Sequence, residues 1–133
     1  MKSEKIVVTE KDYLRLESIF KNLDSDEIEG LEIELERAVI VKDKDVPSDV
    51  VTMNSRVEFI DMKTEKERIV TIVYPEDANS SEGRISILAP LASALIGLKE
   101  EQEIEWEFPS GEIKHLKVLK VHYQPEKSGD WHL

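Results

Sequence analysis

A short strand leading directly into a helix is predicted at residues 85–97, which read ISILAPLASALIG. Residues 85–88 form a β-prone apolar run. Pro90 stands where the first turn of a helix accepts proline, because the amides of that turn have no partner within the helix. Gly97 is suited to the end of the same helix. One apolar face of this segment is formed by Leu91, Ala94, Leu95 and Leu98. The stretch predicts one short helix that packs against a sheet.

On both sides of this stretch the hydrophobic pattern has a period of two. Val57 and Phe59 alternate with charged residues, and Ile104, Trp106 and Phe108 alternate with glutamates. Such alternation is typical of strands with one buried face. Further strand segments are predicted at 68–74 and 115–124, with a turn at 109–111 between the last two strands. The expected fold class is α+β, with a twisted antiparallel sheet and one short helix.

The N-terminal part is predicted to be a short antiparallel helical hairpin. Thr9 is a good N-cap, with Asp12 as an acidic partner three residues later. Each helix is expected to have about 14 to 17 residues, or roughly 21–26 Å at 1.5 Å per residue. Gly30 weakens the second helix by about 1 kcal/mol relative to alanine. The two apolar stripes are Tyr13, Leu16, Ile19, Phe20 and Leu23, then Ile28, Leu31, Leu35 and Ala38.

A charged connector that contains Pro47 separates this pair of helices from the rest of the chain. We therefore expect a helical arm over residues 1–46 and a sheet domain over residues 47–133. The turn and second helix of the arm carry seven acidic residues and no basic one between Asp24 and Glu36. They form either a solvated helix face or a negative prong presented to a basic or metal-containing site.

Composition excludes several classes of function. The chain has 133 residues with 29 acidic and 18 basic side chains, a formal net charge of −11. This balance argues against direct, specific nucleic-acid binding. No apolar run approaches the roughly 20 residues of a membrane span, and no secretory signal is seen. Cysteine is absent, which is compatible with a reducing cytoplasm. We expect a cytoplasmic protein that does not contact a membrane.

Catalytic patterns are scarce. No nucleophile elbow, P-loop or dinucleotide fingerprint occurs. His115 and His122 are seven apart on one predicted strand, so we expect them on opposite faces, unable to share a metal. His132 lies in the tail. Trp106 is interpreted as a core residue, since its flanking glutamates would repel a phosphate backbone. No catalytic residue, metal or cofactor is predicted from these patterns.

The acidic tip allows two interpretations. Asp24 and Glu27 are spaced as D-x-x-E, with Asp26 between them. In the first interpretation Asp24 caps the second helix and Glu27 reaches back to it. In the second, the two carboxylates share a divalent cation such as Mg²⁺.

Four stretches together resemble the C-terminal domain of the Gre transcript-cleavage factors. They are VVTMNSRV at 50–57, ISILAPLASALIG at 85–97, WEFPSG at 106–111 and YQPE at 123–126. The first and last resemble the Rnk branch of that family more than Gre proteins in general. The resemblance implies an N-terminal helical hairpin joined to a sheet domain like that of FK506-binding proteins. It also implies bacterial RNA polymerase as the partner, gripped at the rim of its secondary channel.

The resemblance also implies a docking loop. In the family a polar residue and a Ser-Pro pair lead from a strand into a helix. Here Leu88, Ala89 and Pro90 stand at those positions, so only the proline is kept. Together with Leu91 they form the predicted polymerase-binding surface. The alternative for Leu88 and Leu91 is simple core packing.

In Gre factors the carboxylates at the hairpin tip help to hold the second catalytic Mg²⁺ of the polymerase. The arm here is predicted to be too short for that. Asp24, Asp26 and Glu27 are therefore expected to contact the channel without acting as metal ligands. The expected function is that of a regulator, not an enzyme, which competes with Gre-type factors without stimulating cleavage. An active cleavage factor and a peptidyl-prolyl isomerase are the alternatives.

Overall fold

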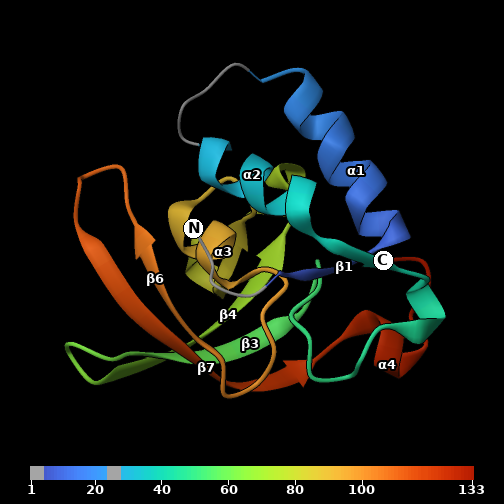
Figure 1. Ribbon diagram of the computed structural model, residues 1–133. Coiled ribbons are helices and arrows are strands. Elements are labelled where there is room, and N and C mark those ends of the chain that lie inside the picture. The colour runs from blue at the N-terminus through green and yellow to red at the C-terminus, as the bar shows by residue number, and fades with distance from the viewer. Residues whose placement is uncertain (1–4, 24–27) are drawn as a thin grey trace.

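The structure, a computed structural model, describes residues 5–23 and 28–133. A curled five-stranded sheet lies on one side, and α1, α2 and α3 lie on the other, while α4 lies beyond the end of β7 (Figure 1). The fold class is α+β, as predicted from the alternating and helical patterns. The sheet strands are β3 (Arg56–Asp61), β4 (Lys66–Val73), β5 (Arg84–Ser86), β6 (Glu103–Glu107) and β7 (Ile113–Tyr123). The helices are α1 (Glu10–Lys21), α2 (Glu29–Arg37), α3 (Pro90–Leu95) and α4 (Pro125–Ser128).

The strand order in the sheet is β5-β4-β3-β7-β6. The pairs β3–β4, β3–β7 and β6–β7 are antiparallel, as expected. The expectation of an antiparallel sheet is wrong at one edge, where β5 runs parallel to β4. The segment between these strands contains two 3₁₀ turns, Pro75–Asp77 and Ser80–Glu82. This segment carries the chain back along the sheet before β5 begins, so the C-terminal ends of β4 and β5 lie side by side.

A second, two-stranded sheet lies at the base of the N-terminal helices. It consists of β1 (Val7–Thr9) and β2 (Val39–Val41), which pair in parallel. The helices between them have 12 and 9 residues, so the expected 14 to 17 is wrong. The second helix ends before Ala38, whose backbone is extended, because a β-branched run of Val39, Ile40 and Val41 follows. The N-terminal end of α1 is as predicted: the Thr9 side chain accepts a hydrogen bond from the Asp12 amide at 3.1 Å.

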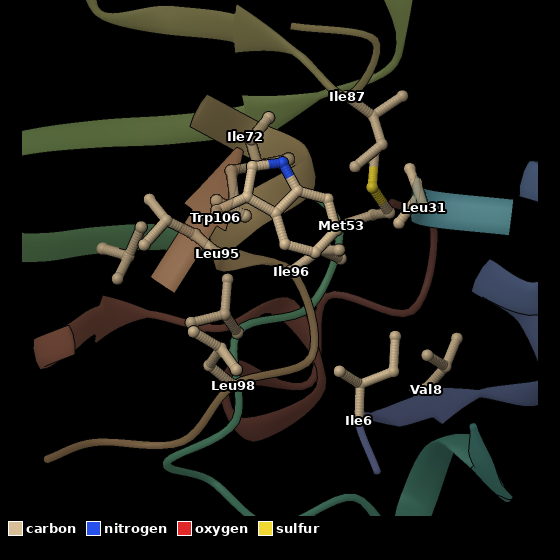
Figure 2. Close-up of a cluster of buried hydrophobic side chains, with 14 of the residues drawn as sticks. Ile6, Val8, Leu31, Met53, Ile72, Ile87, Leu95, Ile96, Leu98 and Trp106 are labelled. Atoms are coloured by element: carbon tan, nitrogen blue, oxygen red, sulfur yellow. The ribbon is translucent and has the colours of Figure 1, made fainter. Parts of the chain in front are cut away.

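The hydrophobic core is continuous between the helices and the sheet. Leu31 of α2 lies beside Met53 and the indole of Trp106 (Figure 2). Trp106 is only 7% exposed, which confirms its prediction as a core residue. The helices contribute Leu16, Phe20, Ile28, Leu31 and Leu35 to the same cluster that holds the inward side chains of β3, β4 and β7.

Gly97 fixes the position of β1 beneath α3. Its φ is +77°, a left-handed conformation, and a Cβ added there would lie 2.5 Å from the Cβ of Ile6. The Val7 amide donates to the Gly97 carbonyl at 3.3 Å. Glycine is required here for backbone conformation and for space, so the predicted end of the helix is also a packing contact.

The stretches at 50–57 and 123–126 lie against each other. The Thr52 hydroxyl donates to the Glu126 carboxylate at 2.8 Å. The Gln124 side-chain amide donates to the carbonyls of Pro47 and Val50, each at 2.8 Å. These bonds join residues more than 70 apart in the sequence, so the two stretches form one structural unit.

Candidate functional site

The predicted docking loop, residues 88–91, leads from β5 into the start of α3. Because β4 and β5 are parallel, their C-terminal ends lie side by side. The loop after β5 therefore lies next to the turn that follows β4. The Ile87 amide donates to the Val73 carbonyl at 2.9 Å. Ser86 then organises the next turn: its hydroxyl accepts from the Leu88 amide at 3.1 Å and its carbonyl from the Ala89 amide at 2.9 Å. The backbone of the loop is therefore fixed on the side of the sheet.

The loop is also fixed from the helix. Ala89 is the N-cap of α3, and its extended backbone has no side-chain capping bond. Ser93 fixes the loop in another way: its amide donates to the Ala89 carbonyl and its hydroxyl to the Ile87 carbonyl, each at 3.1 Å. Pro90 occupies the first helical turn, as predicted. The loop thus keeps an ordered strand-to-helix geometry without a serine at the cap.

The four predicted contact residues are all half-buried. Leu88 and Leu91 pack against the hydrophobic core, while each keeps part of its surface exposed. Core packing, the alternative for these two leucines, therefore accounts for part of each side chain. Ala89 and Pro90 complete a small apolar surface at the edge of the sheet. The structure brings the four together, and their role as a contact surface stays a prediction.

The predicted acidic tip, Asp24, Asp26 and Glu27, lies outside the described residues. The part of the arm that is described is acidic as well. A groove of about 410 Å³ between α1 and α2 is lined by Tyr13, Phe20 and Leu35, by Lys21 and by three glutamates. Its glutamates are Glu17, Glu32 and Glu36. Glu34 is buried and forms an ion pair with Arg37 at 3.2 Å. The exposed glutamates present negative charge along the arm.

Asp12 has a role that the capping interpretation missed. Its carboxylate is buried and accepts from the Met53 amide at 3.1 Å and from the Tyr74 hydroxyl at 3.2 Å. Burial raises the pKa of Asp12 from 3.8 to about 6, against the lowering effect of the Met53 hydrogen bond. Asp12 therefore connects α1 to two separate parts of the sheet domain.

Tyr74 makes a second contact besides its hydrogen bond to Asp12. The Arg15 guanidinium lies 5.5 Å from the ring centroid, a distance at which a cation–π attraction is effective. Burial, and then the nearby charge of Asp12, raise the pKa of the Tyr74 hydroxyl. One signal in the sequence pointed to Asp12: it stands four residues before Leu16 and eight before Phe20, on the buried stripe of its helix.

The two strand histidines lie on the same face of the sheet, so the prediction of opposite faces is wrong. Val57 pairs with Val121, and Phe59 pairs with Val118. Three residue steps on β7 thus match two on β3, and this bulge reverses the alternation along β7. His115 contacts Glu103 and His122 contacts Glu58, each at 2.8 Å. Separate partners hold the two rings, and among residues 5–23 and 28–133 no group of three or more His, Cys, Asp or Glu could hold a metal ion.

In the portion that the structure describes, every helix is too short or too polar to cross a membrane.

Both parts of the chain are similar to known protein families. The C-terminal family of the GreA/GreB transcription elongation factors matches residues 46–123, and the Rnk N-terminus family matches residues 4–41. The regulator of nucleoside diphosphate kinase of Escherichia coli K12 is 43% identical over 103 residues, which is 77% of this chain and 76% of that protein. GreA of Nitratiruptor is 40% identical over 93 residues, 70% of this chain and only 56% of that longer protein.

A solved structure agrees with this assignment. The GreA/GreB elongation factor structure from Nitrosomonas europaea is 40% identical and superposes with a TM-score of 0.74, covering 91% of this chain and all of that one. The family match over residues 46–123 contains the docking loop and the stretch that holds Thr52. The chain belongs to the GreA/GreB family of transcription elongation factors, in the branch of the regulators of nucleoside diphosphate kinase.

Proposed function

We propose that the protein docks on bacterial RNA polymerase at the rim of the secondary channel and competes there with Gre-type factors. The observation that carries this proposal is the docking loop. Its backbone is held by Ser86 and Ser93, and it presents Pro90 at the position where the family keeps a proline. We propose that the protein acts in the cytoplasm as a regulator and not as an enzyme.

In this proposal the two parts of the chain have different roles. The sheet domain, residues 47–133 with a fold like that of FK506-binding proteins, supplies the contact. The antiparallel helical arm, residues 1–46, supplies negative charge at the channel mouth. The net charge of −11 should mainly raise the rate at which the protein associates with a basic channel mouth, and most of all at low salt.

The length of the arm argues against stimulation of transcript cleavage. Helix α1 has 12 residues, so it extends only about 18 Å at 1.5 Å per residue. Metal-ion chemistry needs its ligands at about 2 Å from the ion. Both helices of the arm are packed into the core, through Leu16 of α1 and Leu31 of α2. Asp24, Asp26 and Glu27 are proposed to act through charge at the channel.

A prolyl isomerase is less well supported. Such an enzyme needs an open pocket lined by aromatic side chains. Phe59, Tyr74 and Trp106 are 3%, 7% and 7% exposed and serve the core. The aromatic side chains of the sheet domain are thus largely occupied by packing.

Binding to purified RNA polymerase tests the docking surface. Ala89→Glu adds a charge to the middle of the loop, at a helix N-terminus that tolerates an acidic residue. Ala78→Glu is the matched control, because Ala78 is exposed on the turn after β4. We expect the Ala89 variant to bind at least tenfold more weakly and the control to bind like the parent protein. Unchanged binding by a folded Ala89 variant would remove the loop from the proposed interface.

Stalled elongation complexes test the role of the arm. We expect the protein to slow cleavage stimulated by a Gre factor and to cause none by itself. Replacing both Asp24 and Glu27 with alanine should weaken polymerase binding modestly, and more at low salt, since exposed charges are screened over about 8 Å at physiological ionic strength. If the parent protein shortens the transcript and the double variant does not, the two carboxylates are metal ligands and the reach argument is wrong.

A further inference from the structure

We propose that the outer face of the sheet carries a binding site for a small phosphate compound, formed by Arg56, Thr71 and Arg84. This site is independent of the polymerase contact proposed above. It lies on β3, β4 and β5, on the side of the sheet away from the core.

The three residues form one row across adjacent strands. Arg56 of β3 pairs in register with Thr71 of β4, and Thr71 pairs in register with Arg84 of β5. Strands lie about 4.8 Å apart, so the Cα atoms of the two arginines are roughly 10 Å from each other with Thr71 between them. The next residues, Val57 and Ile85, face the core. The row itself therefore faces outward, and two arginine side chains can converge over the threonine hydroxyl.

The backbone holds this row in place. The Thr71 amide donates to the Gly83 carbonyl at 2.8 Å. Arg84 exchanges two hydrogen bonds with Asn79, at 2.8 and 3.0 Å, which close the loop before β5. Gly83 takes a φ of +74° at the end of that loop. The hydrogen bonds of the sheet thus fix the backbone of Arg84 beside that of Thr71.

A shallow pocket of about 450 Å³ lies over the row, lined by Arg56, Thr71, Gly83 and Arg84 together with Ile69, Val70 and Glu82. Ligand pockets range from about 300 to 1,000 Å³, so this one suits a small ligand. Glu82 is 3.9 Å from Arg84, and both side chains are well exposed. An exposed pair at that distance is worth little, so Glu82 leaves the guanidinium available.

The other acidic side chain beside the row is already occupied. Glu58 lies two residues after Arg56 on the same face of β3, and its carboxylate contacts His122 at 2.8 Å. Arg56 is exposed at the end of its strand. The row thus places two arginines on either side of a threonine, on a strongly acidic protein.

The chemistry favours a diphosphate over other anions. Each guanidinium presents a planar fork that donates two parallel hydrogen bonds to an oxyanion. Two forks and a hydroxyl need more acceptor oxygens than one carboxylate offers, and a diphosphate supplies them. A nucleic-acid strand would extend beyond the row onto a protein of net charge −11, where repulsion opposes it.

Calorimetric titration of the full chain with inorganic pyrophosphate at low salt tests the proposal, with acetate and a single-stranded RNA oligonucleotide as parallel ligands. We expect saturable one-to-one binding of pyrophosphate, much weaker binding of acetate and no tighter binding of RNA. Arg56→Gln and Arg84→Gln should each weaken pyrophosphate binding about tenfold. Thr71→Val should weaken it severalfold.

Arg68→Gln is the matched control. Arg68 is also exposed on β4, but it pairs with Phe59 and lies over that ring, on the opposite face of the sheet. Its replacement should leave the pyrophosphate affinity within about twofold of the parent, and circular dichroism should confirm that all variants fold. The proposal is wrong if pyrophosphate does not bind, if the control loses as much affinity as the row variants, or if RNA binds more tightly through the same arginines.

Discussion

Gly30 of α2 lies directly against the indole of Trp106 on β6. A Cβ added to the glycine would be 3.1 Å from Cζ2 of the ring, closer than side-chain carbons normally approach. The apparent weakness of Gly30 in the helix is therefore the condition under which α2 can lie on the sheet. This is one of the close contacts between the arm and the sheet domain.

Gly30→Ala should lower the free energy of unfolding by about 1 kcal/mol, because the cost of displacing the indole exceeds the gain of about 1 kcal/mol in helix propensity. In a Trp106→Phe background the same change should stabilise the protein, since the ring atoms nearest Gly30 are gone. Urea unfolding of the two single variants and the double variant measures this coupling. Equal effects of Gly30→Ala in both backgrounds would show that the indole is not the obstacle.

Asp12 should make the stability of the fold depend on pH. Its pKa is about 6 in the folded protein, against an ordinary value of 3.8, so the protonated form is favoured by folding. The resulting stabilisation is complete below about pH 4 and is lost as the pH rises through 6. Asp12→Asn removes the charge and keeps an oxygen that can accept from Met53. Relative to this variant, the parent should lose up to roughly 3 kcal/mol between about pH 4 and pH 8.

Asp12→Ala is the control for the hydrogen bonds. It leaves the Met53 amide and the Tyr74 hydroxyl without their acceptor, so at acid pH it should be about 1–3 kcal/mol less stable than the asparagine variant. Chemical unfolding at several pH values measures both effects. Parallel pH profiles for the parent and Asp12→Asn would show that this carboxyl titrates at its ordinary pKa.

Ala89→Ser should stabilise the protein by about 0.5–1 kcal/mol. The residue is the N-cap of α3, its backbone is already extended, and serine would supply the missing acceptor for the first helical turn. Ala89→Val, which adds bulk without an acceptor, should give no such gain. The shift in the urea midpoint at a constant m-value is the measurement. A serine variant no more stable than the valine variant would show that the first helical turn gains nothing from a side-chain acceptor at this position.

Gln124→Leu should destabilise the protein by roughly 2–4 kcal/mol. The change takes the hydrogen-bond donor from two carbonyls, those of Pro47 and Val50, at a buried position. Gln102→Leu is the matched control, because the Gln102 side chain accepts an exposed hydrogen bond from the Lys99 amide. Its effect should stay within about 0.5 kcal/mol. Similar midpoints for the two variants would mean that the contact between the two stretches adds little to stability.

Several elements could be predicted from the sequence because their determinants are local. Three such local determinants each act within a few residues: the alternation along residues 104–108, Pro90 in the first helical turn, and the N-cap Thr9. The direction of β5 could not be predicted in this way, because a period of two is the same in parallel and antiparallel strands. The three-residue strands β1 and β2 are too short for any periodicity to show.

The unpredicted parts of the site depend on distant residues. Asp12 is a plausible helix-capping residue until Met53 and Tyr74 are folded against it, 41 and 62 residues away. The bulge in β7 cannot be read from β7 alone, since it is defined by the pairing with β3. In the same way, Arg56 and Arg84 become neighbours of Thr71 only through strand register.

The pairing of β1 with β2 has an evolutionary consequence. The two strands bring the chain into and out of the helical segment at a single point. Residues inserted equally into both helices at the end far from these strands would lengthen the segment without moving its attachment or the sheet. A lineage could therefore vary the reach of this projection by insertions and deletions while the remainder of the molecule kept its sequence constraints. The GreA relatives, of which the matched region covers little more than half, have the length that such a history would produce.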